Sequence, residues 1–522
     1  MGKSRRNRAG TSQRRDPLAK PVKAPSDPEL AALREAKIIP VINDLQNPDP
    51  KSRSAAAVAV ANIIQDTKCR KLLLREQIVH IILTQTLTDA ALQSRAAGWC
   101  ILQGLVLEEE DDFCVHLFRS DILPAIAHAA KNVSDKLSSL GAGSSEFSPP
   151  EMPLVFGISA SLITLLTTLA EAADDILEAI SSNTTIIDFL FVLVAQDVLV
   201  APANTDDAES NGISSLRDVA LACLMLLTEE NGNLAKKIVT NSKCYQAMSS
   251  LKNHATGEGV LACATLHNVF SALEGLKDAP NVTGADDSLL IPTLTKTIAT
   301  IQPDQQAANG NQNAGIQKAW APVGRTLWEQ VITPILSSDT ADVNLATQVT
   351  GLAWAVSRSL GGSTPLKGDE HRKFISLYQA TKSMEPQDSE DPFQRLGVKC
   401  VGVLGQLAAD PAPASLNREI GTFLITLLTG LPDTPAADAV EALNQVFDIY
   451  SSEGFAYDGE VFWKDNFLNQ LELVLPKARA MVKSVDKKTQ PELRARADEA
   501  VMNLGRFLAY KKKNKPDDVN GS

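Results

Sequence analysis

The chain has 522 residues, of which 44% are hydrophobic, 21% charged and 5% aromatic. This apolar content can fill a large core, and at about 150 residues per domain the length predicts about three domains. There are 50 basic and 62 acidic residues, but residues 1–25 hold eight of the basic residues and one acid. The rest therefore carries 42 basic and 61 acidic groups, a net charge of −19. Such an acidic body excludes a general nucleic-acid binder and favours basic partners.

Residues 1–27 are predicted to be a disordered basic arm, because their prolines prevent helix formation. Two basic clusters followed by Pro-hydrophobic resemble the basic class of proline-tyrosine nuclear localisation signals, which transportin-type import receptors read in extended form. Leu18 replaces the usual tyrosine. The alternatives are a solubilising tail or an RNA-contacting arm. The candidate receptor-binding residues are Lys3, Arg5, Arg6, Arg8, Arg14, Arg15, Pro17 and Leu18.

No apolar run follows this arm, which excludes a secretory signal. The seven cysteines form no C-x-x-C pair and are odd in number. Most lie in apolar helical runs, which is typical of reduced, buried thiols in an intracellular protein.

A repeat of helical periodicity begins at Pro28. Apolar first helices near Pro40, His80 and Pro124 recur every 40 to 44 residues, and Arg53 recurs at Arg95 before Ala-rich second helices. This is the armadillo/HEAT period, and such helices bury their apolar faces only by stacking. The pattern predicts an all-α fold, an armadillo/HEAT α-solenoid of about ten units. Further second helices are expected at 217–227, 258–269, 343–356, 393–408, 436–450 and 491–510.

The predicted organisation is an armadillo-like part over 28–280, a HEAT-like part over 281–510 and a tail over 511–522. Residues 138–150 and 201–212 are predicted loops, and 302–315 a flexible linker. The longest uncharged stretch, 153–170, matches a membrane span in length. It is rich in Ser and Thr and runs into Glu171, so we predict a buried solenoid helix instead.

No feature of the sequence predicts an enzyme. There is no Gly-rich phosphate loop, no G-x-S-x-G elbow and no H-E-x-x-H. The six histidines are scattered, and Cys114 with His116 is too isolated for a metal site. We therefore predict no catalysis, no metal and no cofactor.

The acidic run over 108–112 follows a second helix. It either lines the path of a basic ligand or is a solvated loop near the N-terminus of the next helix. Asn62 stands where armadillo repeats place an asparagine that bonds a ligand backbone, since its amide both donates and accepts. Trp99 is a core residue or a contact residue. The candidate cargo-binding residues are Asn62, Trp99, Gln103, Glu108, Glu109, Glu110, Asp111 and Asp112.

The opening Met-Gly-Lys-Ser-Arg, the armadillo units and the stretch from Glu109 to His116 running into Asp121-Ile-Leu-Pro together resemble the symportin family. The resemblance implies a transport adaptor and dedicated chaperone. Members hold the two newly made ribosomal proteins that bind 5S rRNA and carry them into the nucleus through a transportin-type receptor. The family also has a long acidic insertion in its second half that binds one cargo. Here the corresponding segment, 302–315, contains only Asp304.

The resemblance thus implies basic ribosomal proteins and an import receptor as partners, with no direct nucleic acid and no membrane. Shuttling between cytoplasm and nucleus is implied as well, and we predict a monomer. The alternative function is a solenoid scaffold or regulatory subunit of another complex.

Overall fold

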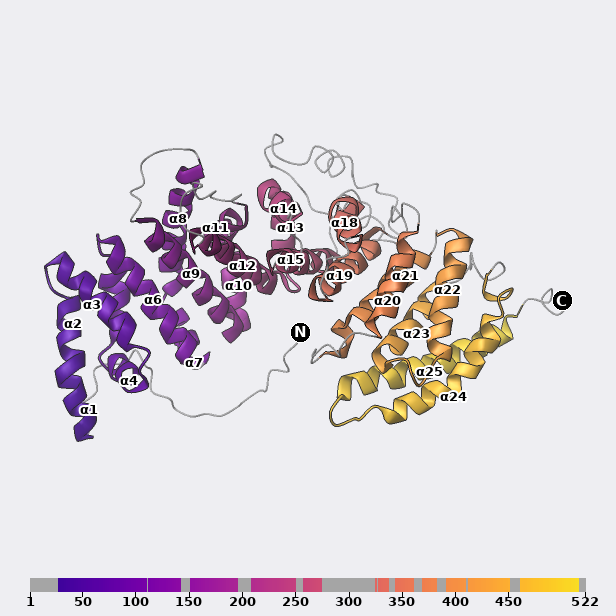
Figure 1. Cartoon of the computed structure of the whole chain (residues 1–522). Helices are drawn as coiled ribbons and strands as arrows, with labels where there is room; N and C mark the ends of the chain where they lie inside the picture. The colour runs from indigo at the N-terminus through magenta and orange to yellow at the C-terminus, as the bar shows by residue number, and fades with distance from the viewer. Residues whose placement is uncertain are drawn as a thin grey trace, which may run out of the picture. The chain divides into compact units, whose positions relative to one another are not determined.

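The computed structural model describes residues 27–109, 111–141, 151–195, 208–249, 257–274, 324–325, 327–337, 343–360, 369–382, 391–409, 412–450 and 461–515. Every regular element in these ranges is a helix, and the fold is an armadillo/HEAT α-solenoid, as the sequence predicts (Figure 1). The helices fall into two compact units that divide between Met248 and Ser249. The boundary predicted after residue 280 lies outside the described residues.

In the first unit, α3, α6, α9 and α12 pack one against the next, and we call them its ladder helices. Helices α3, α6 and α12 contain predicted second helices, and α9 contains the predicted buried helix over 153–170. The unit comprises α1 (Pro28–Leu33), η1 (Arg34–Ile38), α2 (Ile39–Leu45), α3 (Pro50–Ile63), α4 (Thr67–Arg75), α5 (Ile78–Ile81), η2 (Ile82–Thr86), α6 (Leu92–Glu108), α7 (Asp111–Arg119), α8 (Ile122–Gly141), α9 (Met152–Ala172), α10 (Asp174–Ser182), α11 (Thr184–Ala195), α12 (Ala208–Thr228), α13 (Gly232–Thr240) and α14 (Ser242–Ser249).

In the second unit, the ladder helices are α15, α19, α21, α23 and α25, again packed in sequence. Each contains a predicted second helix, except that Phe393 lies before α21 begins. The unit comprises α15 (Gly257–Glu274), η4 (Trp328–Ile332), α18 (Thr333–Leu336), α19 (Val343–Leu360), α20 (Glu370–Thr381), η5 (Pro392–Gln394), α21 (Leu396–Ala408), α22 (Ala414–Thr429), α23 (Ala436–Tyr450), α24 (Phe467–Ser484) and α25 (Pro491–Lys513).

Two of the predicted loops are shorter than expected. Helix α8 continues to Gly141, so residues 138–141 are helical. Helix α12 begins at Ala208, so residues 208–212 are helical as well. Ser and Gly did not mark these helix ends to the residue, because local propensity is a weak guide to where a helix ends. The predicted linker 302–315 lies outside the described residues.

Helix α9 contains residues 153–170, the uncharged stretch that matches a membrane span in length. It is long and apolar enough to cross a bilayer by length and composition, and half of its most apolar window is buried in the protein. It packs between the ladder helices α6 and α12. These contacts are those of the buried solenoid helix that the sequence predicts.

Proline explains an irregularity in the first helices. Pro40 and Pro334 each stand at the second position of a helix that directly follows a π-turn. In both places the residue before the proline donates its N–H five residues back, from Ile39 to Arg34 and from Thr333 to Trp328. Because proline has no N–H and its ring crowds the preceding turn, the helix widens locally instead of ending.

Close helix approach explains two glycines of α21. A Cβ on Gly402 would lie 2.3 Å from the Trp354 ring, and one on Gly405 would lie 1.9 Å from the Gln445 amide oxygen. Any larger residue would therefore push α19 and α23 away. Glycine costs about 1 kcal/mol in a helix interior, which the closer packing must offset.

Candidate functional site

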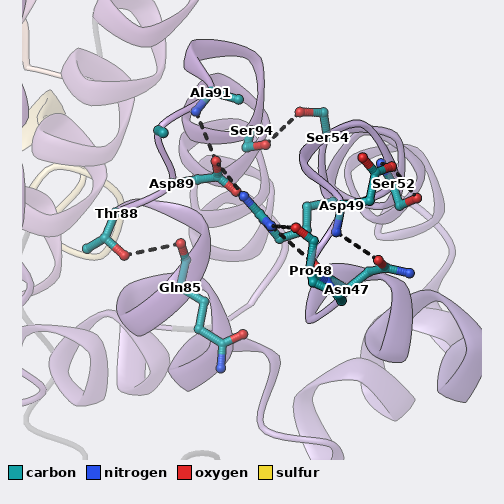
Figure 2. A network of polar contacts seen from close by, with 12 residues as sticks. Asn47, Pro48, Asp49, Ser52, Ser54, Gln85, Thr88, Asp89, Ala91 and Ser94 are labelled. Atoms are coloured by element: carbon teal, nitrogen blue, oxygen red, sulfur yellow. Dashed lines mark hydrogen bonds and ion pairs between the residues drawn. The ribbon is translucent and has the colours of Figure 1, made fainter.

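The joint between α3 and α6 shows what the recurring arginine does (Figure 2). Arg53 donates to the carbonyl oxygens of Asn47 and Pro48, and Arg95 donates to those of Asp89 and Ala90. In both repeats the arginine thus bonds the carbonyls five and six residues before it. The arginine thereby fixes the turn that precedes the ladder helix, so its role is structural.

Polar side chains also join the two repeats across this turn. The hydroxyls of Ser54 and Ser94, both buried, lie 2.8 Å apart. Arg53 Nε donates to Asp89 Oδ2 at 2.6 Å, and this carboxylate side chain is only 2% exposed. The Arg53 guanidinium and the Ala91 N–H lower the pKa of Asp89 against the opposing effect of burial.

The two polar candidates on the ladder helices α3 and α6, Asn62 and Gln103, differ in exposure. Asn62 is exposed on α3, next to exposed Val58 one turn before it. Gln103 on α6 is half-buried, and its amide oxygen accepts from Ser161 of α9 at 2.8 Å. Helices α3 and α6 pack side by side. Because Asn62 is exposed, its amide can bond a ligand, whereas the Gln103 amide oxygen already accepts a hydrogen bond from Ser161.

Trp99 does not belong to this surface. It is 2% exposed, so the contact interpretation is wrong and the core interpretation holds. Helix α6 packs closely against its neighbours, because a Cβ on Gly98 would lie 2.9 Å from Leu87 and one on Gly104 would lie 3.4 Å from Ile64.

The acidic run divides into two parts. Arg70 of α4, itself 5% exposed, reaches Glu109 at 2.9 Å and Glu108 at 3.3 Å. It also donates to the Ile64 carbonyl oxygen. Glu109 is 26% exposed and holds one repeat to the next, while Glu108 is 44% exposed. In the first part of the run, Glu109 therefore has a structural role, whereas Glu108 remains largely accessible to solvent.

The second part of the run begins α7. Asp111 and Asp112 are exposed in its first turn, where negative charge is favoured by the helix dipole. Glu110 lies outside the described residues. The structure thus places Glu108 at the surface on the last residue of α6, and Asp111 and Asp112 at the surface in the first turn of α7. Both interpretations of the run, ligand path and solvated helix start, keep a structural basis.

The basic arm, with all eight candidate receptor-binding residues, lies outside the described residues. Among the residues that are described, no group of three or more His, Cys, Asp or Glu side chains could hold a metal ion. All seven cysteines are free, and six are buried.

Sequence reasoning missed the polar interior of the second unit. Lys399, Asp438 and Glu441 are each less than 9% exposed on ladder helices. A signal was present, since Lys399 interrupts the apolar run from Leu396 to Leu404 and Glu441 stands among Ala and Val in α23. A charged residue inside such a run indicates either a buried polar contact or a site.

Comparison with known proteins identifies relatives over the whole length. A family model described as "SYO1-like, TPR repeats" matches residues 231–515. The chain is 39% identical to Symportin 1 of Chaetomium thermophilum, over 99% of this chain and 100% of that protein. It is 23% identical to Synchronized import protein 1 of Saccharomyces cerevisiae, over 98% and 99%. It is 30% identical to "Armadillo repeat protein involved in nucleocytoplasmic transport Syo2" of Schizosaccharomyces pombe, over 32% and 23%.

The alignments also show a difference in length. The alignment with Symportin 1 runs over 690 positions, whereas this chain has 522 residues. At least 168 of those positions, the difference of the two numbers, therefore have no counterpart in this chain.

Proposed function

The chain belongs to the symportin family, and from this premise we propose that it is a nuclear import adaptor and chaperone for newly made basic ribosomal proteins, the pair that binds 5S rRNA. The names of two relatives, one of synchronized import and one of nucleocytoplasmic transport, support the import role. The acidic body, with a net charge of −19 outside residues 1–25, supports basic cargo.

The observation that carries the cargo proposal is the surface formed by Glu108, Asp111 and Asp112, which we call the acidic edge. Glu109 pairs with Arg70 at the end of α6, and Asp111 and Asp112 stand in the first turn of α7. Clustered carboxylates create a negative potential at the surface, which favours a basic ligand. The exposed amide of Asn62 on the neighbouring ladder helix α3 would bond the cargo backbone.

The proposed path of transport follows from the arm. Its basic residues and Pro17-Leu18 would be read by a transportin-type receptor while the solenoid holds the cargo. The complex would shuttle between cytoplasm and nucleus as one adaptor with its cargo. The cargo contact that the family makes through its long acidic insertion would differ here, because the corresponding segment contains only Asp304.

The experiment is co-migration on a sizing column with the co-expressed pair of 5S-binding ribosomal proteins, at low and moderate salt. We expect a ternary peak that weakens as salt screens the charges. A binary peak would limit the function to one cargo. Migration of the chain without either protein would overturn the cargo proposal and favour the scaffold alternative.

A further inference from the structure

The charge of the last two helices differs from that of the rest of the chain. Residues 461–515, which contain α24 and α25, hold 13 basic and six acidic residues, a net charge of +7. The whole chain carries −12, so the total conceals a basic segment at the end of the second unit. The two helices pack side by side there (Figure 1). A basic segment on an acidic protein indicates a surface for an anionic partner.

Most acids of this segment are already paired with cations. Four of the six form ion pairs: Asp465 with Arg418, Glu472 with Lys512, Glu492 with Arg496 and Asp498 with Arg494. Six other cations of α24, α25 and the turn between them are exposed, and their side chains make no ion pair or hydrogen bond with the residues that the structure describes. We call these six the basic end: Arg479, Lys483, Lys487, Lys488, Arg506 and Lys513.

Arg479 and Lys483 lie on the face of α24 that borders α25. They follow Glu472 by seven and eleven residues, which are about two and three turns, so all three share one side of the helix. Glu472 reaches Lys512 of α25 at 2.6 Å, which places this side next to α25. Like charges four residues apart destabilise a helix. The turn that follows adds two more lysines of the basic end, so the positive charge continues beyond α24.

Arg506, Tyr510 and Lys513 share one exposed face of α25. They stand four and three residues apart, about one turn each. The helix packs against α23 and α24, and its buried residues, which include Leu504 and Leu508, lie on other sides. Tyr510 is 45% exposed, although its ring is large and apolar. An exposed aromatic ring between two cations can stack on a base while the cations bind the neighbouring phosphates.

We propose that the basic end binds a single-stranded nucleic acid, with phosphates on its six cations and a base stacked on Tyr510. The cations are spread along α25, since Lys488 precedes its start and Lys513 is its last residue. A helix of 23 residues extends about 35 Å. A nucleic-acid strand carries one negative charge per nucleotide without interruption, which matches a row of cations of this length.

A single strand suits the basic end better than the two other polyanions. An acidic peptide offers no base to Tyr510, so its ring would gain no stacking partner. In a duplex the bases are stacked on one another, and an exposed tyrosine on a helix surface does not reach their faces. RNA and DNA share the phosphates and bases that the proposal needs, and the test separates them. The proposal departs from the expectation of no direct nucleic acid, and it goes beyond cargo binding because its ligand is anionic.

The test uses the full chain and fluorescein-labelled probes in anisotropy titrations at several salt concentrations. The probes are an oligouridylate, an oligothymidylate, a DNA duplex of the same length and a polyglutamate peptide of the same charge as one strand. The strands have about 12 nucleotides, which exceed the length of α25 at about 3.4 Å per nucleotide.

Three protein variants separate charge from stacking. Arg479→Gln with Lys483→Gln removes two cations of the basic end. Lys71→Gln with Arg75→Gln is the matched control, because it removes an exposed lysine and an exposed arginine four residues apart on α4 of the first unit. Tyr510→Leu removes the ring and keeps an apolar side chain.

We expect both single strands to bind, and the tighter one identifies the preferred sugar. The slope of log K against log salt should be about −4, since each of the six phosphate contacts contributes about −0.7. The Gln pair at 479 and 483 should reduce this slope by about 1.4 in magnitude and weaken binding about tenfold to thirtyfold at about 0.1 M salt. Tyr510→Leu should weaken binding about fivefold to a hundredfold, the value of one stacked base, and leave the slope unchanged. The control pair should change neither.

Four results would overturn the proposal: no binding of either single strand by the unaltered chain, equal losses for the two Gln pairs, binding of polyglutamate as tight as that of the single strands, or tighter binding of the duplex. The third would assign the basic end to an acidic protein, and the fourth to a duplex. Ribosomal proteins are absent from these titrations, so this proposal and the cargo proposal fail separately.

Discussion

Arg53 donates from Nε to the Asp89 carboxylate at 2.6 Å and thereby joins one repeat to the next. The arginine lies in the first turn of α3, and the aspartate lies in the turn before α6. Arg53 is 25% exposed, whereas the Asp89 side chain is almost completely buried. The same carboxylate accepts the Ala91 N–H, so it also fixes the turn in which it stands.

Replacement of Asp89 by Asn should destabilise the first unit by about 1–3 kcal/mol, because a charged hydrogen bond in a buried place is lost. Urea unfolding followed by hydrogen exchange of α3 and α6 would measure this. Asp465→Asn is the control, since its partner Arg418 is 46% exposed, and exposed ion pairs contribute at most about 1 kcal/mol. Equal effects of the two variants would contradict the role assigned to Asp89.

The stability that Asp89 provides should depend on pH in a defined direction. Its pKa in the folded chain is lowered from the ordinary value of 3.8. The stabilisation is therefore fully present above the pKa of the unfolded chain and is lost as the pH falls through the lower, folded pKa. The difference between the unaltered chain and Asp89→Asn should accordingly begin to shrink as the pH falls below about 4 and keep shrinking toward the folded pKa. A constant difference down to pH 3 would contradict it.

Asp438 should show the opposite dependence. Burial raises its pKa to about 6, although Tyr378 donates to it at 2.9 Å and Arg395 and Lys382 act in the other direction. A raised pKa means that stability is present below the unfolded pKa and is lost as the pH rises through 6.

Asp438→Asn should therefore stabilise the second unit at pH 8, by up to about 3 kcal/mol, and should make no difference near pH 4. Thermal unfolding at several pH values would measure this. Tyr378→Phe is the matched control: it removes the hydroxyl that favours the carboxylate and should lower stability at pH 8. A destabilising Asp438→Asn at pH 8 would show that the charge itself is needed.

The repeat was readable from the sequence because stacking requires it. Arg53 and Arg95 recur since each turn needs a donor for two carbonyls, and the Ala-rich runs recur since ladder helices approach closely. Periodicity could not decide whether Trp99 is buried or exposed. Helix α6 contacts α3, α7 and α9, so several of its faces are buried, and the sequence pattern alone does not say which face remains exposed to solvent. Lys399 was missed for a related reason. It is buried against Gly351, which stands 48 positions earlier in the chain.

The arm offers a prediction that does not depend on the fold. If a transportin-type receptor reads it, Pro17→Ala with Leu18→Ala should abolish most nuclear accumulation of a fluorescent fusion, because the terminal anchor of the signal is lost. Lys20→Ala with Lys23→Ala is the control, since it removes two charges of the arm outside the predicted signal. If the two pairs of substitutions reduced import equally, charge alone would be responsible and the solubilising or RNA-contacting alternatives would gain support.

The role of the acidic edge in cargo binding can be tested by comparing two helices that begin with the same pair of acids. Asp111 and Asp112 are exposed in the first turn of α7, and Asp174 and Asp175 are exposed in the first turn of α10. Replacing either pair by Asn removes the same favourable interaction with a helix dipole. The two double variants should therefore lose similar, small amounts of stability.

Their effects on cargo should differ. If the acidic edge binds the basic ribosomal proteins, the Asn pair at 111 and 112 should weaken binding about twofold to tenfold at low salt, with a smaller difference at high salt. The Asn pair at 174 and 175 should bind as the unaltered chain does. Glu109→Gln separates structure from binding, because it loses the contact with Arg70 and should lower stability by about 1–3 kcal/mol. Isothermal titration at two salt concentrations measures the affinities, and equal losses for both Asn pairs would mean that the cargo responds only to net charge.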